Sequence, residues 1–330
     1  MVSLSAFLIP EAMNAKTPVM APTRDGFGKG VVEAAERDER VVLVCADLME
    51  STRSHWFYEK FPERYIEIGV AEQNLATVGS GLANYGKVPF IASYATFSPG
   101  RNNEQIRTTI SINNVGVKIC GMHAGVSVGP DGATHQALED IALMRVQPNM
   151  TVVVPADSEE ARKATIAAAG TKGPVYLRFG REKTPVFTTA KTPFAIGKAI
   201  TLWEEEYPDV AIIACGSLVH NALLAASQLS AEGVRAIVIN NHTIKPMDEE
   251  AVVAAAQRAG AVVTVEEHQV AGGMGSAVAE VLARRHPVPM EFIGVHDQFG
   301  QSGEPDELIH HYGMNVYAIK SAAQKAIARK

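Results

Sequence analysis

Short runs of apolar, often β-branched residues alternate with longer amphipathic stretches along most of this chain of 330 residues. Several runs are apolar at every position, which is typical of strands that are buried on both faces of a parallel sheet. Strands that alternate with helices in this way predict an α/β fold. The predicted strands are Val41–Ala46, Val115–Gly121, Thr151–Pro155, Val175–Phe179, Val210–Cys215, Val234–Asn240, Ala261–Val265 and Phe292–Val295. The predicted helices are Lys29–Arg37, Glu72–Tyr85, Gln136–Arg145, Ser158–Ala169, Leu218–Leu229, Asp248–Ala259 and Gly273–Arg284.

The apolar pattern is interrupted between Arg181 and Phe194, a stretch that holds two prolines and four threonines. A segment of this composition without an apolar period is typical of a linker between domains. We therefore expect two α/β domains, at residues 17–186 and 197–330, joined by a linker at residues 187–196. In the first domain we expect a parallel sheet with helices on both faces.

The composition excludes several classes of function. Lys and Arg total 30 and Asp and Glu total 36, so the formal net charge of −6 favours neither nucleic acid nor an anionic membrane surface as a partner. No apolar run approaches the ~20 residues of a membrane-spanning helix, and residues 1–17 lack the basic start and apolar core of a signal peptide. Cys45, Cys120 and Cys215 lie in apolar runs without a C-x-x-C pair, so we expect buried thiols and a cytoplasmic location.

A candidate catalytic carboxylate, Glu72, lies in the run Ile66–Asn74, where a strand is expected to give way to a helix. An acidic residue in the first turn of a helix often does no more than complement the helix dipole. Gly79 and Gly81, further along the same helix, each cost about 1 kcal/mol relative to alanine. Their presence indicates that something approaches the backbone of this helix closely.

Two aromatic residues, Tyr94 and Phe97, close the run Pro89–Phe97. Their spacing would place both rings on one face if a helix begins here. Aromatic pairs at this spacing commonly belong to a core, and the alternative is a platform on which a flat ring stacks. The sequence leaves both readings open.

The run His123–Gln136 holds three glycines, two histidines and one aspartate, and it lacks long apolar side chains. An Asp-Gly turn in a surface hairpin would explain part of this composition. However, the run follows a predicted buried strand and is expected to enter a helix at His135. Loops at the carboxyl ends of parallel strands commonly carry ligand chemistry. No pair of potential ligands here has the i, i+4 spacing of a helical metal site, so we predict a functional loop without a metal.

The motifs together resemble those of the transketolase family. The main matches are G-V-A-E-Q-N at Gly69–Asn74, S-Y-A-T-F at Ser93–Phe97 and H-A-G-V-S-V-G-P-D-G-A-T-H-Q at His123–Gln136. Further matches are A-D-L-M-E-S at Ala46–Ser51, L-E-D at Leu138–Asp140, P-A-D at Pro155–Asp157 and E-E-H…G-G-M-G-S at Glu266–Ser276. They follow the family's order over nearly the whole chain. The resemblance is to the family's pyrimidine-binding domain followed by its carboxyl-terminal domain, and it implies those two folds here.

The resemblance implies thiamine diphosphate as the cofactor. Glu72 matches a buried glutamate that meets the ring nitrogen of the aminopyrimidine, and a carboxyl kept protonated by apolar surroundings can donate to that nitrogen. The ring can then take the proton of the reactive thiazolium carbon, and the cofactor serves as the electron sink. Tyr94 and Phe97 match the aromatic residues that sandwich the aminopyrimidine. A third aromatic residue is common in transketolases where Gly100 stands, and this departure resembles deoxyxylulose-phosphate synthases.

The resemblance also implies a sugar-phosphate substrate. Asp131 matches a residue that contacts a donor hydroxyl, and His135 matches a catalytic residue beside the ketol carbons. Cations and hydroxyl groups suit a phosphate, which offers charge and several acceptor oxygens. The positions that match the phosphate-binding residues are Arg24, Ser51, His123 and Arg178, with Arg181 as an alternative to Arg178.

One motif of the family is absent from the sequence, the G-D-G and following asparagine that bind magnesium diphosphate. We therefore expect a separate N-terminal subunit that binds the diphosphate and holds Mg²⁺ (or Ca²⁺). The expected assembly is α2β2, with a β–β contact and with cofactors at the boundaries between subunits. On this interpretation the chain is one gene product of a split transketolase. It would transfer a two-carbon ketol unit between sugar phosphates, and it would be inactive alone.

Three alternatives stay open at this point: half of a deoxyxylulose-phosphate synthase, the beta subunit of a 2-oxo-acid dehydrogenase, and a non-catalytic scaffold subunit. The D-G-A-T-H-Q motif favours the sugar-phosphate branch over the dehydrogenase. Glu72, Asp131 and the two loop histidines argue against a scaffold, because a scaffold has no physical need for that set.

Overall fold

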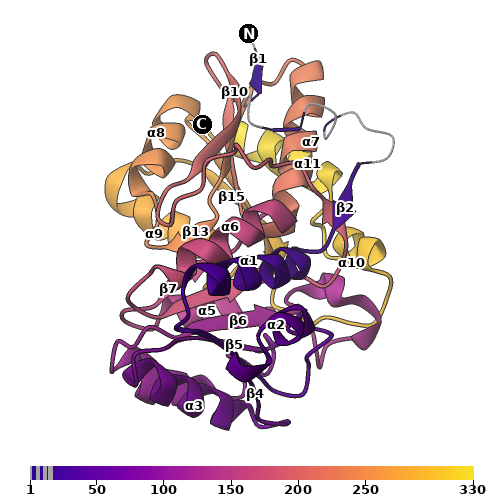
Figure 1. Ribbon diagram of the computed structural model, residues 1–330. Coiled ribbons are helices and arrows are strands. Elements are labelled where there is room, and N and C mark those ends of the chain that lie inside the picture. The colour runs from indigo at the N-terminus through magenta and orange to yellow at the C-terminus, as the bar shows by residue number, and fades with distance from the viewer. Residues whose placement is uncertain (1, 5–7, 10–12, 14–17) are drawn as a thin grey trace.

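The structure is a computed structural model that describes residues 2–4, 8, 9, 13 and 18–330 (Figure 1). Most of the segment 1–17, including the predicted domain start at Thr17, lies outside the described residues. Within the described part, no helix is both long and apolar enough to cross a membrane.

A seven-stranded sheet is built mainly from the first half of the chain, in the order β13-β7-β8-β6-β5-β3-β4. Neighbouring strands are parallel except for β13, which runs antiparallel to β7 at the edge. The strands are β3 (Val41–Cys45), β4 (Tyr65–Glu67), β5 (Val88–Tyr94), β6 (Lys118–Met122), β7 (Thr151–Val153), β8 (Val175–Arg178) and β13 (Thr243–Lys245).

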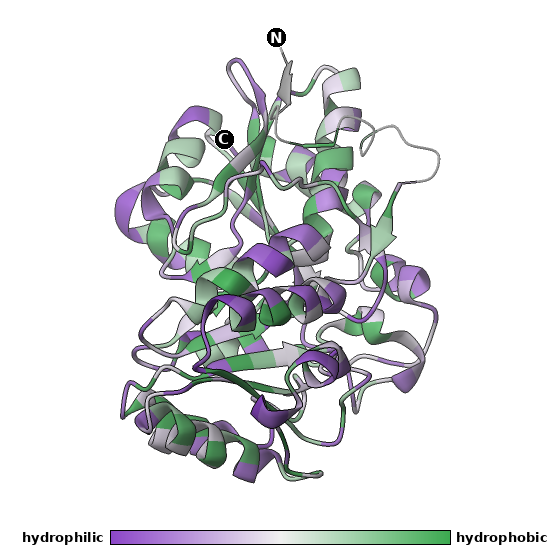
Figure 2. Ribbon diagram, in the orientation of Figure 1, coloured by the Kyte–Doolittle hydropathy of each residue, from purple (hydrophilic) through white to green (hydrophobic). Residues whose placement is uncertain are grey.

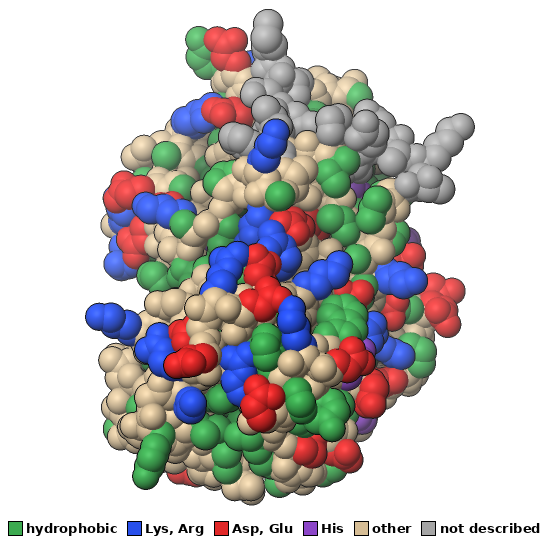
Figure 3. All heavy atoms as spheres, viewed as in Figure 1, with side chains coloured by type: hydrophobic (Ala, Val, Ile, Leu, Met, Phe, Trp, Pro, Cys, Tyr) green, Lys and Arg blue, Asp and Glu red, His purple; other side chains and the backbone are tan. Residues whose placement is uncertain are grey.

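Helices cover both faces of this sheet, as predicted (Figure 1). On one face α1 (Thr23–Arg37) packs against α6 (Ser158–Ala169), and on the other α3 (Glu72–Asn84) packs against β5. Hydrophobic and hydrophilic residues alternate along these helices in Figure 2, in keeping with one buried and one exposed side. In Figure 3 charged side chains of both signs intermix over α1 and α6, where Arg162 pairs with Glu33 and Glu159.

A six-stranded sheet is built mainly from the second half of the chain, in the order β1-β10-β12-β11-β14-β15. The four strands from β12 to β15 in this order are parallel, whereas β10 and β1 extend the edge in antiparallel pairs. The strands are β1 (Val2–Leu4), β10 (Ile200–Glu205), β11 (Val210–Ala214), β12 (Ala236–Asn240), β14 (Val262–Gln269) and β15 (Met290–Val295). The remaining pair of short strands is β2 (Met20–Ala21) with β9 (Thr184–Pro185).

The remaining helical elements connect or cover these sheets. They are α2 (His55–Lys60), α4 (Asn103–Gln105), α5 (Asp140–Arg145), α7 (Val219–Ala231), α8 (Glu249–Ala259), α9 (Met274–Arg285), α10 (Pro305–His311) and α11 (Val316–Ile327). Short 3₁₀ helices occur at Pro62–Arg64, Val126–Asp131 and Gly216–Leu218, and a π-helical segment at Ile106–Ser111.

The two halves of the chain meet at a junction whose side chains are buried, here called the sealed junction. The edge strand β13 belongs to the second half but pairs with β7 of the first. Buried residues of both halves, such as Met144 and Val152 with Ile244 and Met274, form one apolar cluster. The predicted linker is packed as well. The backbone N–H groups of its residues Phe187 and Thr188 donate to the carboxylate of Asp157 at 2.9 and 2.7 Å.

The α/β prediction is confirmed, and every predicted strand occurs within a few residues of its expected position. Asp157 caps α6, since its side chain accepts from the backbone N–H of Glu160 at 2.9 Å. The three cysteines are buried and unpaired. Among the elements that were not predicted are the strands β5, β10 and β13 and the helices α2, α10 and α11.

Candidate active site

The predicted site residues converge at one edge of the seven-stranded sheet. Tyr94 is the last residue of β5, His123 directly follows β6, and Glu72 opens α3 after β4. The strands β4, β3, β5 and β6 are parallel neighbours, so their carboxyl ends meet at this edge. That edge is where α/β folds place ligand chemistry.

Glu72 is buried, with 2% of its surface exposed. Its Oε2 accepts a hydrogen bond from Nη1 of Arg101 at 3.1 Å, and its Oε1 accepts from the hydroxyl of Ser93 at 3.4 Å. The burial agrees with the prediction, but the apolar surroundings were wrong, because the Arg101 guanidinium lies against the carboxylate. Arg101 is a site residue that the sequence analysis missed, since a single arginine in a turn carries no motif signal.

Four rings gather after the end of β5. The rings of Tyr94 and Phe97 lie 6.2 Å apart with planes at 15°, and the ring of His123 stacks on Tyr94 at 4.0 Å. His135 meets Phe97 edge-on at 5.4 Å. No helix begins here, because Tyr94 ends a strand and Phe97 lies in the turn that follows. Both aromatic residues are only partly buried, which favours the platform over the core.

The residue at position 100 has no room for a side chain. A Cβ added to Gly100 would lie 1.9 Å from the carbonyl oxygen of Thr96, so a third aromatic residue does not fit this backbone. Instead the guanidinium carbon of Arg101 lies 4.8 Å from the centroid of the Phe97 ring. The departure from the pattern of three aromatic residues therefore has a steric basis in this chain.

His123 is held as a neutral ring that accepts a hydrogen bond. Burial, reinforced by the positive charges of Arg24 and Arg181, lowers the pKa of His123 to about 3. Nη1 of Arg24 lies 2.9 Å from Nε2 of His123 and donates to the carbonyl oxygen of Ser51 at 2.8 Å. Because Arg24 can only donate, the His123 ring carries its proton on Nδ1. The backbone φ of His123 is +54°, a conformation that non-glycine residues adopt mainly at functional sites or in turns.

The loop after His123 forms the 3₁₀ helix Val126–Asp131 rather than an open hairpin. The helix expected from Gln136 begins only at Asp140. The amide of Gln136 donates to the carbonyl oxygens of Val126 at 3.0 Å and Gln301 at 2.9 Å, so its side chain closes the loop instead of starting a helix. His135 remains partly exposed at the mouth of the site, with its Nδ1 2.9 Å from the hydroxyl of Thr134.

The two candidate phosphate-binding arginines near the end of β8 differ in environment. Arg178 is 6% exposed, and its guanidinium is bonded to the Asp140 carboxylate at 2.7 and 3.2 Å and to the carbonyl oxygens of Ala137 and Glu267. Its Nε and Nη2 donors are therefore committed to the junction between the two halves. Arg181 is 32% exposed and lies 3.5 Å from Asp131 in the loop. The structure thus brings Arg181, and not Arg178, to the side of the predicted site.

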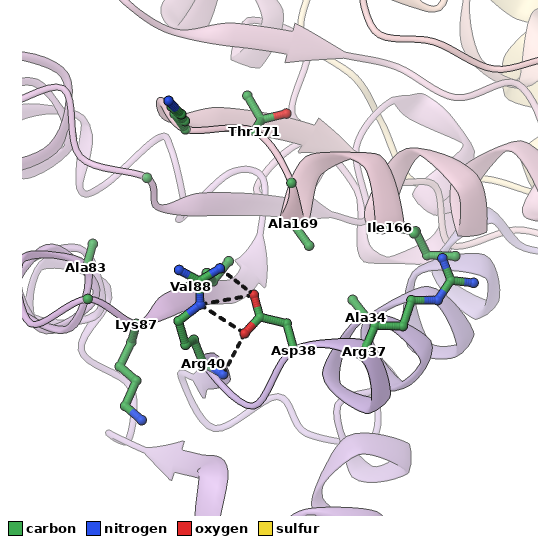
Figure 4. A pocket seen from close by; sticks show the side chains of 14 residues that line it. Ala34, Arg37, Asp38, Arg40, Ala83, Lys87, Val88, Ile166, Ala169 and Thr171 are labelled. Carbon is green, nitrogen blue, oxygen red and sulfur yellow. Dashed lines mark hydrogen bonds and ion pairs between the residues drawn. The ribbon is translucent and has the colours of Figure 1, made fainter.

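One hollow, at the opposite edge of the sheet, contains none of these residues. It has a volume of about 510 Å³ and lies at the amino ends of the strands, next to Arg37, Arg40, Lys87 and Lys172. Figure 4 shows Arg40 already paired with Asp38, by contacts as short as 2.7 Å. Among the described residues there is no group of three or more His, Cys, Asp or Glu side chains placed to hold a metal ion.

Comparison with known proteins identifies the family. Residues 20–186 match the model of the transketolase pyrimidine-binding domain, and residues 197–319 match that of the transketolase C-terminal domain. The chain belongs to the transketolase family. A pyrimidine-binding domain of this family implies the use of thiamine diphosphate.

Several relatives are about the same length as this chain. The 6-deoxy-6-sulfo-D-fructose transketolase subunit SqwH of Clostridium sp. (strain MSTE9) is 40% identical over 93% of this chain and 95% of its own. One of the subunits of the apulose-4-phosphate transketolase of Phocaeicola vulgatus is 35% identical over 94% of this chain and 99% of its own. A solved split-gene transketolase, described as an inactive beta4 tetramer, is 44% identical over 94% of this chain and 99% of its own, with a TM-score of 0.87.

Human transketolase, by contrast, is 31% identical over 99% of this chain but over only 52% of its own length. Together these comparisons confirm the prediction that the chain is the carboxyl-terminal subunit of a split transketolase, which is a transferase. They give less support to a deoxyxylulose-phosphate synthase half, a 2-oxo-acid dehydrogenase subunit or a non-catalytic scaffold subunit.

Proposed function

We propose that this chain supplies the pyrimidine-binding half of an active site that transfers a two-carbon ketol unit between sugar phosphates. The N-terminal partner subunit would bind the diphosphate and hold Mg²⁺ (or Ca²⁺). The observation that carries the proposal is the arrangement of Glu72, Phe97 and Arg101. A flat group that bears N–H donors already lies over the Phe97 ring and against the Glu72 carboxyl. These residues therefore fit the aminopyrimidine of thiamine diphosphate.

Each residue then has a definite task at the cofactor. The carboxyl of Glu72 forms a hydrogen bond with the ring nitrogen of the aminopyrimidine. Phe97 and Tyr94 provide the aromatic surface that orients this ring. The hydroxyl of Ser93 donates to Oε1 of the Glu72 carboxyl, which leaves Oε2 to face the ring. When bound, thiamine diphosphate supplies the electron sink for cleavage of the carbon–carbon bond.

We assign the substrate to the residues on the other side of the rings. Asp131 contacts a donor hydroxyl, and His135, partly exposed beside Phe97, lies next to the ketol carbons. Arg24 and neutral His123 present N–H donors to the substrate phosphate, with Ser51 beside them. We assign the last phosphate contact to Arg181 in place of Arg178, because Arg178 is buried with its Nε and Nη2 bonded within the fold, whereas Arg181 is partly exposed beside Asp131.

We further propose an α2β2 assembly in the cytoplasm, with a β–β contact and with residues 187–196 as the linker between domains 17–186 and 197–330. The absence of a G-D-G motif from the sequence supports a partner that completes the site. The solved relative at 44% identity, described as an inactive beta4 tetramer, is consistent with a beta subunit that needs such a partner.

The test is reconstitution. We expect ketol transfer between sugar phosphates when the chain is mixed with its partner subunit, thiamine diphosphate and Mg²⁺, and no transfer when either subunit is omitted. Release of carbon dioxide from pyruvate by the same mixture would favour the synthase or dehydrogenase alternative. Tight binding of thiamine diphosphate by the chain alone, measured by calorimetry, would contradict the shared site.

A further inference from the structure

The guanidinium of Arg101 lies where the proposed function requires a ligand. Its carbon is 4.8 Å from the centroid of Phe97, and its Nη1 donates to Glu72 at 3.1 Å. We propose that Arg101 is an internal placeholder: it fills the aminopyrimidine subsite in the resting chain and must swing out before the cofactor binds. This inference rests on the proposed function and adds to it a competitor within the chain.

The chemistry of the two groups matches. A guanidinium is flat and delocalised, it stacks on aromatic faces, and it presents N–H donors in one plane. The amine-bearing pyrimidine ring makes the same two contacts, a stacking contact with an aromatic ring and a hydrogen bond to a carboxyl group. One side chain can therefore satisfy both Phe97 and Glu72 while the ring is absent.

The backbone around Arg101 is anchored, whereas its side chain is not. The neighbouring Asn102 is fully buried, and its Nδ2 donates to the backbone carbonyl of Glu72 at 2.8 Å and to the Ser98 hydroxyl at 3.1 Å. The side chain of Arg101 is 52% exposed and makes a single hydrogen bond to the Glu72 carboxylate. The guanidinium can thus leave the subsite while the turn keeps its place.

The guanidinium gives the buried Glu72 carboxyl a hydrogen-bond partner until the cofactor arrives. Because a half-exposed ion pair and a cation–π contact are each weak, the competitor is easily displaced. We expect Arg101 to weaken binding at the subsite by about tenfold, which corresponds to ~1.4 kcal/mol.

The experiment is a calorimetric titration of the full-length chain, without its partner, with thiamine. Arg101→Met removes the cation and the flat group but keeps the length of the side chain. We expect this variant to bind thiamine about tenfold more tightly than the wild type. Arg101→Lys keeps the charge without the flat stack and should fall between the two. Arg107→Met, which removes an exposed arginine from the adjacent π-helical segment, is the matched control and should bind like the wild type.

The proposal is overturned if Arg101→Met binds thiamine no better than the wild type, including the case in which neither binds measurably. If circular dichroism shows that Arg101→Met is misfolded, Arg101→Lys takes its place. Equal binding of thiamine by Arg101→Lys and by the wild type then overturns the proposal. Failure of the proposed function is a separate outcome, namely the absence of ketol transfer by the wild-type chain with its partner. The placeholder can therefore fail while the proposed function stands.

Discussion

Two arginine–carboxylate pairs lie within this fold in opposite settings. At the mouth of the site, Arg101 is half-exposed and reaches buried Glu72 through one hydrogen bond. At the junction between the two halves, Arg178 and Asp140 are both buried and are joined by two hydrogen bonds. Although burial disfavours its charge, the Asp140 carboxylate raises the pKa of Arg178. The same burial would raise the pKa of Asp140, but Arg178 lowers it.

The difference shows that residue type alone does not separate a structural pair from a functional one. The number of hydrogen bonds and the access of water distinguish the open pair, Arg101 with Glu72, from the sealed pair, Arg178 with Asp140. A pair with a half-exposed partner contributes about 0–1 kcal/mol and can exchange that partner for a ligand. A sealed pair contributes little net stability as a pair, but removal of one member leaves a buried charge that nothing compensates.

The largest expected effect is on stability, at the sealed pair. Arg178→Met leaves the Asp140 carboxylate buried, and the hydroxyl of Tyr176, at 2.6 Å, is the one side-chain donor that remains to it in the part of the chain that the structure describes. We expect this variant to lower the free energy of unfolding by about 3–5 kcal/mol. Urea denaturation of the full chain, followed by circular dichroism, measures the change.

Arg101→Met is the matched control for that experiment, because it removes the same kind of side chain from the open pair. Its cost should not exceed about 1 kcal/mol. Equal losses for the two variants would show that the contrast between the open and the sealed pair is not real.

The second prediction concerns activity at the open pair. Glu72→Gln keeps the size of the side chain. Its oxygen can still accept from Arg101 while its NH2 group donates to the Ser93 hydroxyl, but the substitution removes the carboxyl's ability to exchange a proton. In the complex with the partner subunit, we expect turnover to fall at least ~100-fold, or ~2.7 kcal/mol, with little change in unfolding. A variant that retains most of its turnover in steady-state kinetics would remove Glu72 from the mechanism.

The third prediction tests the sealed junction through pH. Burial lowers the pKa of His268 to about 4, with Asp140 opposing the shift and Arg178 reinforcing it. Its Nδ1 donates to the carbonyl oxygen of Gln269 at 2.7 Å, and its Nε2 faces the backbone N–H of Ala142 at 3.4 Å, so the neutral ring is the form that fits. The stability from His268 should be complete above pH 6.5 and lost as the pH falls towards 4, by at most ~1.4 kcal/mol per pH unit.

Glu266 lies beside His268, and burial raises its pKa to about 7, so its contribution changes with pH in the opposite direction. The difference in stability between wild type and His268→Gln isolates the histidine. We expect this difference to shrink between pH 6.5 and 4.5 in urea denaturation. A difference that does not vary with pH would mean that His268 is not held neutral by the junction.

The sequence predicted the parts of the fold that local pattern determines. Continuous apolar runs marked the parallel strands, and the run His123–Gln136 stood out by its composition. The strand β5 was missed because Pro89 and the polar Ser93 break its apolar run. The edge strand β13 depends on contact between the two halves, which no local pattern records.

Within the site, the motifs located Glu72, the aromatic residues and the loop but could not describe how arginines are used. Arg178 and Arg181 lie three positions apart and have the same chemistry, so only the burial of one and the exposure of the other distinguish them. Arg101 belongs to no motif, and its contact with Glu72 exists only because the turn after β5 folds back onto the start of α3.

Two glycines of α3 also differ in their surroundings, one crowded and one open. Alanine substitutions there give the smallest expected effect on stability. A Cβ added to Gly79 would lie 2.7 Å from a methyl carbon of Ile91, whereas one added to Gly81 would meet nothing within 4 Å. Gly81→Ala should therefore raise the free energy of unfolding of the isolated chain by about 0.5–1 kcal/mol, because alanine lowers the entropy of the unfolded chain and favours the helix. Gly79→Ala, the matched control, should lose stability because the helix must move away from β5. Thermal unfolding measures both changes, and stabilisation by both substitutions would show that α3 is not packed against β5 as closely as the structure places it.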